Sequence, residues 1–262
     1  PWSAGAPVVA GTLAASRWFD AFTLVAAGTV EIGSPQNVTL ERPAASYQPP
    51  IRDPFAPGVP GTGVPLPAQS GTCNQTNFSL GPNQTQAMSP GRYCGGMDLK
   101  GNAQLSPGVY VIQNGDMTVN AQANISCPSC TPGNGVTFVF TGEANQIGAP
   151  KINGGATIDL VGGTAGYPGM LMYQDPRAPA GNDIKLNGGA GINTSGLFYF
   201  PAADLTVNGN FGGSNTTCKA FIAESIVLTG TTQQTVRVEG CAALGLDAET
   251  ELPQILVVRL VE

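Results

Sequence analysis

The sequence predicts an all-β protein, a parallel β-solenoid in the form of a right-handed β-helix with about seven turns or more. Composition is the first observation behind this class. The 262 residues include 36 glycines and 22 prolines but only 11% charged residues, which is typical of a chain with many turns. The second observation is a recurring phrase: an apolar residue, any residue, an apolar residue, then Asn, Thr or Lys, then Gly or Ala. Its clear copies are residues 97–101, 117–121, 150–154, 184–188, 205–209 and 226–230.

The spacing of this phrase is the third observation. With an earlier copy at 78–81, the second apolar residue falls at positions 80, 99, 119, 152, 186, 207 and 228, so four of the six gaps are 19 to 21 residues. The other two gaps equal one repeat plus an insert of about a dozen residues. One short strand cannot bury its apolar pair alone, so the copies must stack as parallel strands about 4.8 Å apart. We expect a stacked interior row of Leu99, Val119, Ile152, Leu186, Val207 and Leu228.

Four copies of the phrase have asparagine at the fourth position. Asn tolerates the left-handed conformation that a sharp bend needs, and its amide can bond to the local backbone. Stacked asparagines can also bond to one another along the axis. The alternative is that they are ordinary turn residues. We predict a turn ladder of Asn120, Asn153, Asn187 and Asn208.

The repeats divide the chain into three parts. Residues 1–70 are predicted to be an N-terminal cap and a proline-rich connector, residues 71–241 the β-helix, and residues 242–262 a C-terminal strand that packs on it. Residues 10–27 form either an amphipathic helix or, from position 22 onward, early strands. In both cases this segment should cover the end of the stack, because an open end exposes unpaired backbone.

Each repeat also has a second strand, usually opened by glycine and apolar on both faces. These strands are residues 108–112, 135–140, 169–173, 196–200 and 220–223. Only one face of each strand can point inward, so the other face must be covered by another element or by a partner. We expect residues 1–28 or the strand at 255–261 to provide the cover. The outward row is predicted to consist of Tyr110, Val139, Leu171, Phe198 and Ile222.

The six cysteines indicate disulfides and an oxidising compartment. Sequence alone leaves 15 connectivities open. The Cys-Pro-Ser-Cys segment at 127–130 is either a loop staple or a redox or zinc half-site. The staple is favoured, because a loop rather than a helix start follows it. The spacings suggest the pairs Cys73–Cys94, Cys127–Cys130 and Cys218–Cys241.

Several segments resemble the C-terminal region of TadG-like proteins, which belong to the bacterial Tad (Flp) pilus-assembly systems. The Tyr-Gln-Asp-Pro-Arg segment at 173–177 is similar to an aromatic-Gln-Asp-Arg segment of that family. The resemblance covers about residues 70–241. It implies a secreted or surface-anchored protein of the pilus machinery or envelope, of a family whose members usually carry an N-terminal membrane helix. The other matching segments are residues 93–96, 106–112, 117–120, 135–142 and 196–201.

The sequence does not predict catalysis. With no histidine, the chain has no Ser-His-Asp triad and no histidine metal site. The acids are scattered, whereas a glycoside hydrolase needs converging carboxylates. The best cluster is read either as a Ca²⁺ or sugar site or, preferably, as an ion pair that fixes a long loop. It consists of Asp175, Arg177, Asn182 and Asp183.

Together, these features predict a non-enzymatic extracellular structural or adhesive module of a bacterial pilus or envelope assembly, without catalytic residues, metal or cofactor. The expected partners are other pilus or envelope proteins and surface carbohydrate. A net charge of −6 without a basic run argues against nucleic acid. Arg17 and Asp20 interrupt the apolar stretch near the N-terminus, which argues against a transmembrane segment in this chain. The alternative function is a carbohydrate-binding or polysaccharide-degrading β-helix protein.

Overall fold

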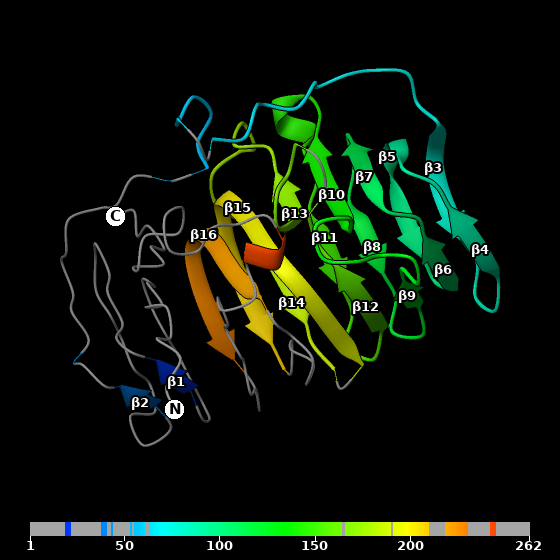
Figure 1. Ribbon diagram of the computed structural model, residues 1–262. Helices are drawn as coiled ribbons and strands as arrows, with labels where there is room; N and C mark the ends of the chain where they lie inside the picture. Colours follow the sequence, from blue (N-terminus) through cyan, green and yellow to red (C-terminus); the bar gives the residue numbers. More distant parts are fainter. Residues whose placement is uncertain are drawn as a thin grey trace.

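A computed structural model describes residues 19–21, 38–40, 43, 53, 55–60, 63–163, 166–189, 191–209, 218–229 and 242–244. Strands dominate these residues (Figure 1), accompanied by two short 3₁₀ helices, Ala144–Gln146 and Ala242–Leu244. The strands are β1 (Phe19–Ala21), β2 (Val38–Leu40), β3 (Gln75–Leu80), β4 (Thr85–Met88), β5 (Gly91–Leu99), β6 (Asn102–Leu105), β7 (Gly108–Gln113), β8 (Met117–Val119), β9 (Asn124–Ser126), β10 (Val136–Thr141), β11 (Pro150–Ile152), β12 (Thr157–Val161), β13 (Met170–Gln174), β14 (Asn182–Asn187), β15 (Ile192–Asn208) and β16 (Lys219–Thr229).

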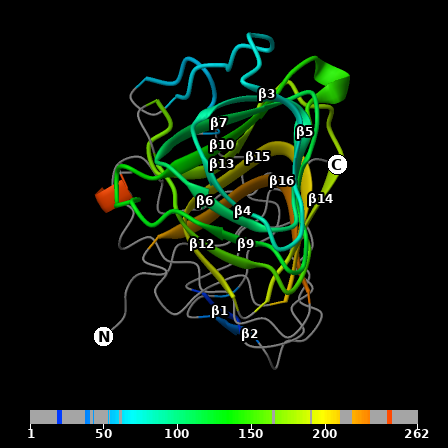
Figure 2. The ribbon, with the colours of Figure 1, turned by 90° about the vertical axis from the view of Figure 1, so that its right-hand side faces the viewer.

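Eight of these strands form a closed parallel β-barrel. Their order is β13-β10-β7-β5-β8-β11-β14-β15, and the ring closes because β15 also pairs with β13. From β15 the sheet continues through β12, β9, β6 and β4, while β3 joins β5 and β16 joins β15. In Figure 2 the strands surround the core. The all-β class is confirmed, but the predicted β-solenoid, a right-handed β-helix of seven or more turns, is wrong.

Two long strands that continue through bends account for this difference. The solenoid prediction treats every bend as the end of a strand. Instead, β5 pairs with β7 before Gly95 and with β8 after Gly96. These glycines have φ values of 77° and 99°, which side chains rarely tolerate, so the strand bends there without ending. β15 likewise pairs with β12, β13 and β14 along successive parts of its length, which joins the two ends of the ring.

The register of the repeats, in contrast, agrees with the prediction. Each member of the interior row is the Cα partner of the next, from Leu80 through to Leu228. The first six side chains of the row are at most 1% exposed. Repetition of one apolar position therefore builds a continuous core column, because every copy is paired with its neighbours on both sides. The column runs through Leu80, Leu99, Val119, Ile152, Leu186 and Val207.

The second strands also form a column, but their predicted faces are partly wrong. Gly108 is the Cα partner of Val136 rather than of Gly135, so the opening glycines are not aligned. A slip of one residue moves side chains to the opposite face. Tyr110, Leu171 and Phe198, which were predicted to face outward, thus belong to the inner core together with Phe138 and Phe221. The outer face carries Val109, Val111, Val139, Met170, Tyr173, Leu197, Tyr199 and Ile222.

The proline-rich connector and Leu244, in the 3₁₀ turn after β16, cover this outer face. Phe55, Val64 and Leu244 are 1–2% exposed and pack against the outer strands. Phe55 meets the ring of Tyr199 edge to face at 6.1 Å. The Tyr199 hydroxyl donates to Asp53 Oδ2 at 2.6 Å. An internal cover was predicted, but the segments proposed for it, 1–28 and 255–261, contain no described side chains.

Two of the predicted disulfides are present. Cys73–Cys94 ties the segment before β3 to β5, and Cys127–Cys130 closes a tight loop after β9. Cys218 is also disulfide-bonded, although its predicted partner Cys241 lies outside the described residues. The described disulfides are compatible with an oxidising compartment. The predicted C-terminal strand in 242–262 lies outside the described residues except for the 3₁₀ turn.

Candidate functional site

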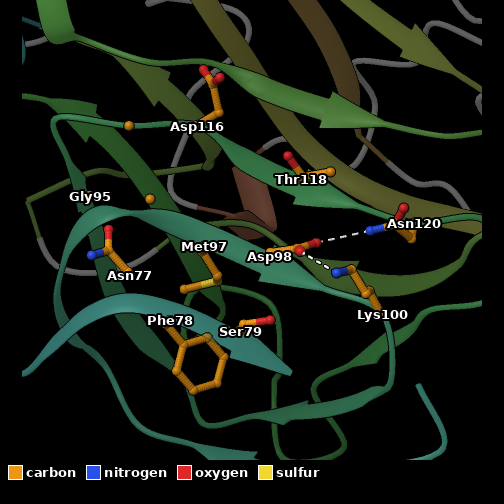
Figure 3. A pocket seen from close by; sticks show the side chains of 12 residues that line it. Asn77, Phe78, Ser79, Gly95, Met97, Asp98, Lys100, Asp116, Thr118 and Asn120 are labelled. Atoms are coloured by element: carbon orange, nitrogen blue, oxygen red, sulfur yellow. Dashed lines mark hydrogen bonds and ion pairs between the residues drawn. The ribbon is translucent and has the colours of Figure 1, made fainter. Parts of the chain in front are cut away.

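An open groove lies on the outside of the barrel, across β3, β5 and β8 (Figure 3). Its volume is about 650 Å³. Successive side chains of a strand point to opposite faces, so Met97 and Leu99 enter the core while Asp98 faces outward between them. We call this hollow the Asp98 groove and define it by its polar lining residues Asn77, Ser79, Asp98, Lys100, Asp116, Thr118 and Asn120.

A second hollow extends the groove. It has a volume of about 340 Å³ and is lined by residues of the loops that follow β3 and β8. Lys100 and Asn120 line both hollows, so the two are continuous at these side chains. Two adjoining hollows suit a chain-like ligand better than a compact one.

Each oxygen of the first carboxylate in the groove, that of Asp98, has one partner within the protein. Lys100 Nζ lies 2.8 Å from Asp98 Oδ2, and Asn120 Nδ2 donates to Asp98 Oδ1 at 2.9 Å, as Figure 3 shows. The lysine and aspartate side chains are 44% and 37% exposed, so water weakens their attraction. Asp98 therefore fixes its neighbours and retains lone pairs on the solvent side for a ligand.

The second carboxylate is engaged in the same manner. Lys151 Nζ lies 2.5 Å from Asp116 Oδ2, and the Ala149 amide donates to Asp116 Oδ1 at 2.9 Å. Each acid of the groove thus has its own lysine, and the charges balance locally.

Polar rungs between neighbouring strands extend beyond the groove. The predicted asparagine ladder is present in part, since Asn208 Nδ2 donates to Asn187 Oδ1 at 2.9 Å. Asn120 bonds to Asp98 instead of to Asn153. Elsewhere Asn193 Nδ2 donates to Asp159 Oδ1 at 2.9 Å. The amides therefore pair with whichever acceptor the neighbouring repeat offers.

The predicted Asp175–Arg177 cluster is a structural clamp. Asp175 is fully buried. Arg177 donates to both of its carboxylate oxygens, from Nε to Oδ1 at 2.8 Å and from Nη2 to Oδ2 at 2.6 Å. Thr141 Oγ1 donates to the same carboxylate at 2.8 Å. Arg177 also donates to the Pro67 carbonyl at 2.6 Å, which ties the connector to the barrel. The Asp175 carboxylate also raises the pKa of Arg177 through this bonding.

The other two residues of that predicted cluster belong to a different place. Asn182 and Asp183 lie on β14, where Asp183 is the Cα partner of Asp204 on β15. Ser225 donates to Asp204 through a short hydrogen bond. The structure thus separates the four residues into a buried clamp and a surface row on the strands.

Several titratable groups outside the groove are buried. Burial raises the pKa of Tyr199, and the neighbouring Asp53 carboxylate raises it further. Burial also lowers the pKa of Lys219, at the start of β16, to about 7. Both side chains are shielded from solvent, and so neither can meet a ligand at the surface of the described fold.

No cluster of three or more potential metal ligands of the His, Cys, Asp or Glu type occurs among the described residues. None of the helices in the described segments has the length and apolar character that a membrane crossing requires. Comparison of the chain with protein-family models, curated proteins and solved structures returns no match.

The groove was not predicted, although the recurring phrase contains a signal for it. Asp98 and Thr118 occupy the free middle position of the recurring phrase, between two apolar residues. That position faces outward in every copy because the flanking residues face the core. Reading the middle positions as one surface row would have placed these two side chains beside each other. Ser79 and Lys151 occupy the same position and follow the same rule, whereas Asn77 and Asp116 lie outside the phrase, and their contribution required the structure.

Proposed function

We propose that this chain is a non-enzymatic structural and adhesive module of the bacterial cell surface, associated with a pilus or envelope assembly. The observation that supports the proposal is the way in which the outward polar side chains are paired. In the groove and along the rungs, carboxylates pair with amides and lysines, in three of the four cases from a neighbouring repeat, instead of converging as a reactive set. The Cys73–Cys94 disulfide links the segment before β3 to β5 beside this surface, which therefore suits binding by a fixed polar array.

The cellular part of the proposal is supported by the resemblance of residues 70–241 to TadG-like proteins. Its test is deletion of the gene in a bacterium that carries it. We expect fewer attached cells in a surface-adhesion assay, with recovery when the full chain is supplied from a plasmid. Normal attachment and normal pilus number after deletion would reject the proposal.

The non-enzymatic part has a separate test. The purified chain should release no reducing ends from a panel of plant, fungal and bacterial polysaccharides during prolonged incubation. Turnover that disappears in an Asp183→Asn, Asp204→Asn double variant would show that the strand-paired acids act as catalysts. That result would replace the structural reading by a hydrolase of the two-carboxylate type.

A further inference from the structure

We propose that the Asp98 groove binds a neutral oligosaccharide. This inference rests on the proposed adhesive function and supplies its ligand class. The argument starts from the backbone. Asp98 lies between β3 and β8, and Thr118 lies between β5 and β11, so β5 and β8 have neighbours on both sides, whereas β3 pairs only with β5. The backbone groups of β5 and β8 are therefore used within the sheet, and a ligand above these two strands must be recognised by side chains.

Those side chains are polar and of mixed type. They provide carboxylate, amide, hydroxyl and ammonium groups on adjacent strands, spaced by about 4.8 Å. A ligand rich in hydroxyl groups, each both donor and acceptor, can satisfy such a surface at several points at once. A sugar chain offers these groups repeatedly along its length, and the adjoining second hollow gives the chain room to continue.

Charge narrows the ligand class further. Asp98 is balanced by Lys100 and Asp116 by Lys151, so the groove carries no net charge from these four residues. Polyanions such as nucleic acids require an excess of cations, whereas the whole chain has a net charge of −6. A divalent cation requires carboxylates that are not already held by lysines. Lipids and amphipathic peptides require an apolar groove. A neutral, hydroxyl-rich chain fits best.

The test uses isothermal titration of the purified full chain with short soluble fragments of β-1,4-glucan, β-1,4-linked N-acetylglucosamine polymer and α-1,4-glucan, and with oligogalacturonate as the acidic comparison. We expect weak binding of at least one neutral fragment and none of the acidic one. Failure of every neutral fragment to bind would overturn the proposal, as would preferential binding of the acidic fragment.

Matched variants locate the binding. Thr118→Arg fills the groove, and Thr206→Arg places the same side chain at the corresponding outward position of β15, outside it. Each threonine precedes a buried valine on its strand. With melting temperatures unchanged, Thr118→Arg should weaken binding at least about tenfold and Thr206→Arg should leave it unaltered. Equal affinities in the two variants would overturn the assignment to the groove.

A second pair of variants removes side-chain amides instead of adding a large side chain. Asn120→Ala deletes a groove amide, while Asn208→Ala deletes an amide of the ladder. Only the first change should weaken binding. The adhesion assay separates this inference from the proposed function: attachment that needs the chain but survives Thr118→Arg, with no sugar bound, overturns the groove proposal alone. Sugar binding in the groove without any effect of gene deletion on attachment supports the inference and rejects the adhesive role.

Discussion

At single residues, the same kind of ion pair has different roles according to its burial. Asp175 is 0% exposed and its partner Arg177 34%, whereas the Asp98–Lys100 pair is 37% and 44% exposed. Exclusion of water strengthens the attraction between charges and also increases the cost of losing one partner. The buried pair is therefore a structural requirement, while the exposed pair contributes mainly to the shape and charge balance of the groove.

Arg177→Ala should lower the free energy of unfolding by about 3–5 kcal/mol, because it leaves the buried Asp175 carboxylate without its cation. Lys100→Ala is the matched control at an exposed pair and should cost about 0–1 kcal/mol. Urea unfolding followed by circular dichroism measures both. Similar losses for the two variants would show that burial does not distinguish the pairs.

Lys219 should make stability depend on pH. Burial lowers its folded-state pKa to about 7, against the ordinary value of 10.5. Between these values the unfolded chain binds a proton that the folded protein does not, so the free energy of unfolding should rise with pH, by at most about 1.4 kcal/mol per unit. Urea midpoints measured between about pH 7 and 9 should show this rise.

The rise should disappear in Lys219→Met and persist in Lys185→Met, a control at an exposed lysine. The pH range stops below 10 because burial raises the pKa values of several tyrosines, among them Tyr110, Tyr173 and Tyr199, above 10.0. Unfolded tyrosines ionise from that pH upward, which opposes the lysine effect. An unchanged slope in Lys219→Met would contradict the assignment.

At the scale of elements, the first strands need protection because they lie at the free edge of the described sheet. β3 pairs only with β5, and β4 is the last strand beyond β6. The edge is blunted by a register shift at Asn77, which has a φ of 49°, and by uncharged polar side chains. Such irregular edges discourage pairing with other chains. The Cys73–Cys94 disulfide adds a covalent anchor.

The Cys73–Cys94 disulfide should contribute more to the free energy of unfolding than the second described disulfide, Cys127–Cys130. The cysteines of Cys73–Cys94 are separated by 21 positions in the sequence, and those of Cys127–Cys130 by 3. Loop entropy predicts losses of about 3 and about 2 kcal/mol when each pair is replaced by alanines. Thermal unfolding of the two double variants measures the order. A larger loss for the Cys127–Cys130 replacement would contradict the role of loop length.

At the scale of the whole molecule, the strands on one side of the barrel are apolar on both their inner and their outer face. Both faces therefore have to be covered. The inner core fills the ring, and the outer cluster on β7, β10, β13, β15 and β16 lies beneath the connector. An uncovered outer cluster would be a large apolar patch on a protein with few charges. The hydrogen bonds from Tyr199 to Asp53 and from Arg177 to Pro67 position the cover.

Phe55→Ala should loosen this cover and expose the outer strands. We expect stronger binding of a hydrophobic dye and faster proteolysis within residues 53–69, with far-ultraviolet circular dichroism retained because the ring stays closed. Leu66→Ala is the control, since Leu66 lies on the same connector but is 45% exposed, against 1% for Phe55. Equal protease sensitivity of both variants would show that the connector is not held by Phe55.

The sequence by itself determined the all-β class, the register of the core column and the spacing of the described disulfides. These features depend on local alternation and on a repeat length that brings each copy beside the next. It also placed Asp175 beside Arg177 and favoured an ion pair. It did not join Asp98 to Asn77 and Asp116 as one groove, because these two residues lie outside the recurring phrase.

Only the tertiary structure decided how the ring closes, which face of each second strand points inward, and what covers the outside. Closure depends on whether β5 and β15 continue through their bends, and a glycine pair can either end a strand or bend it. The inward face depends on a slip of one residue between Gly108 and Gly135. The cover depends on contacts between Phe55 and Tyr199, which are 144 positions apart and have no periodic relation for a sequence to reveal.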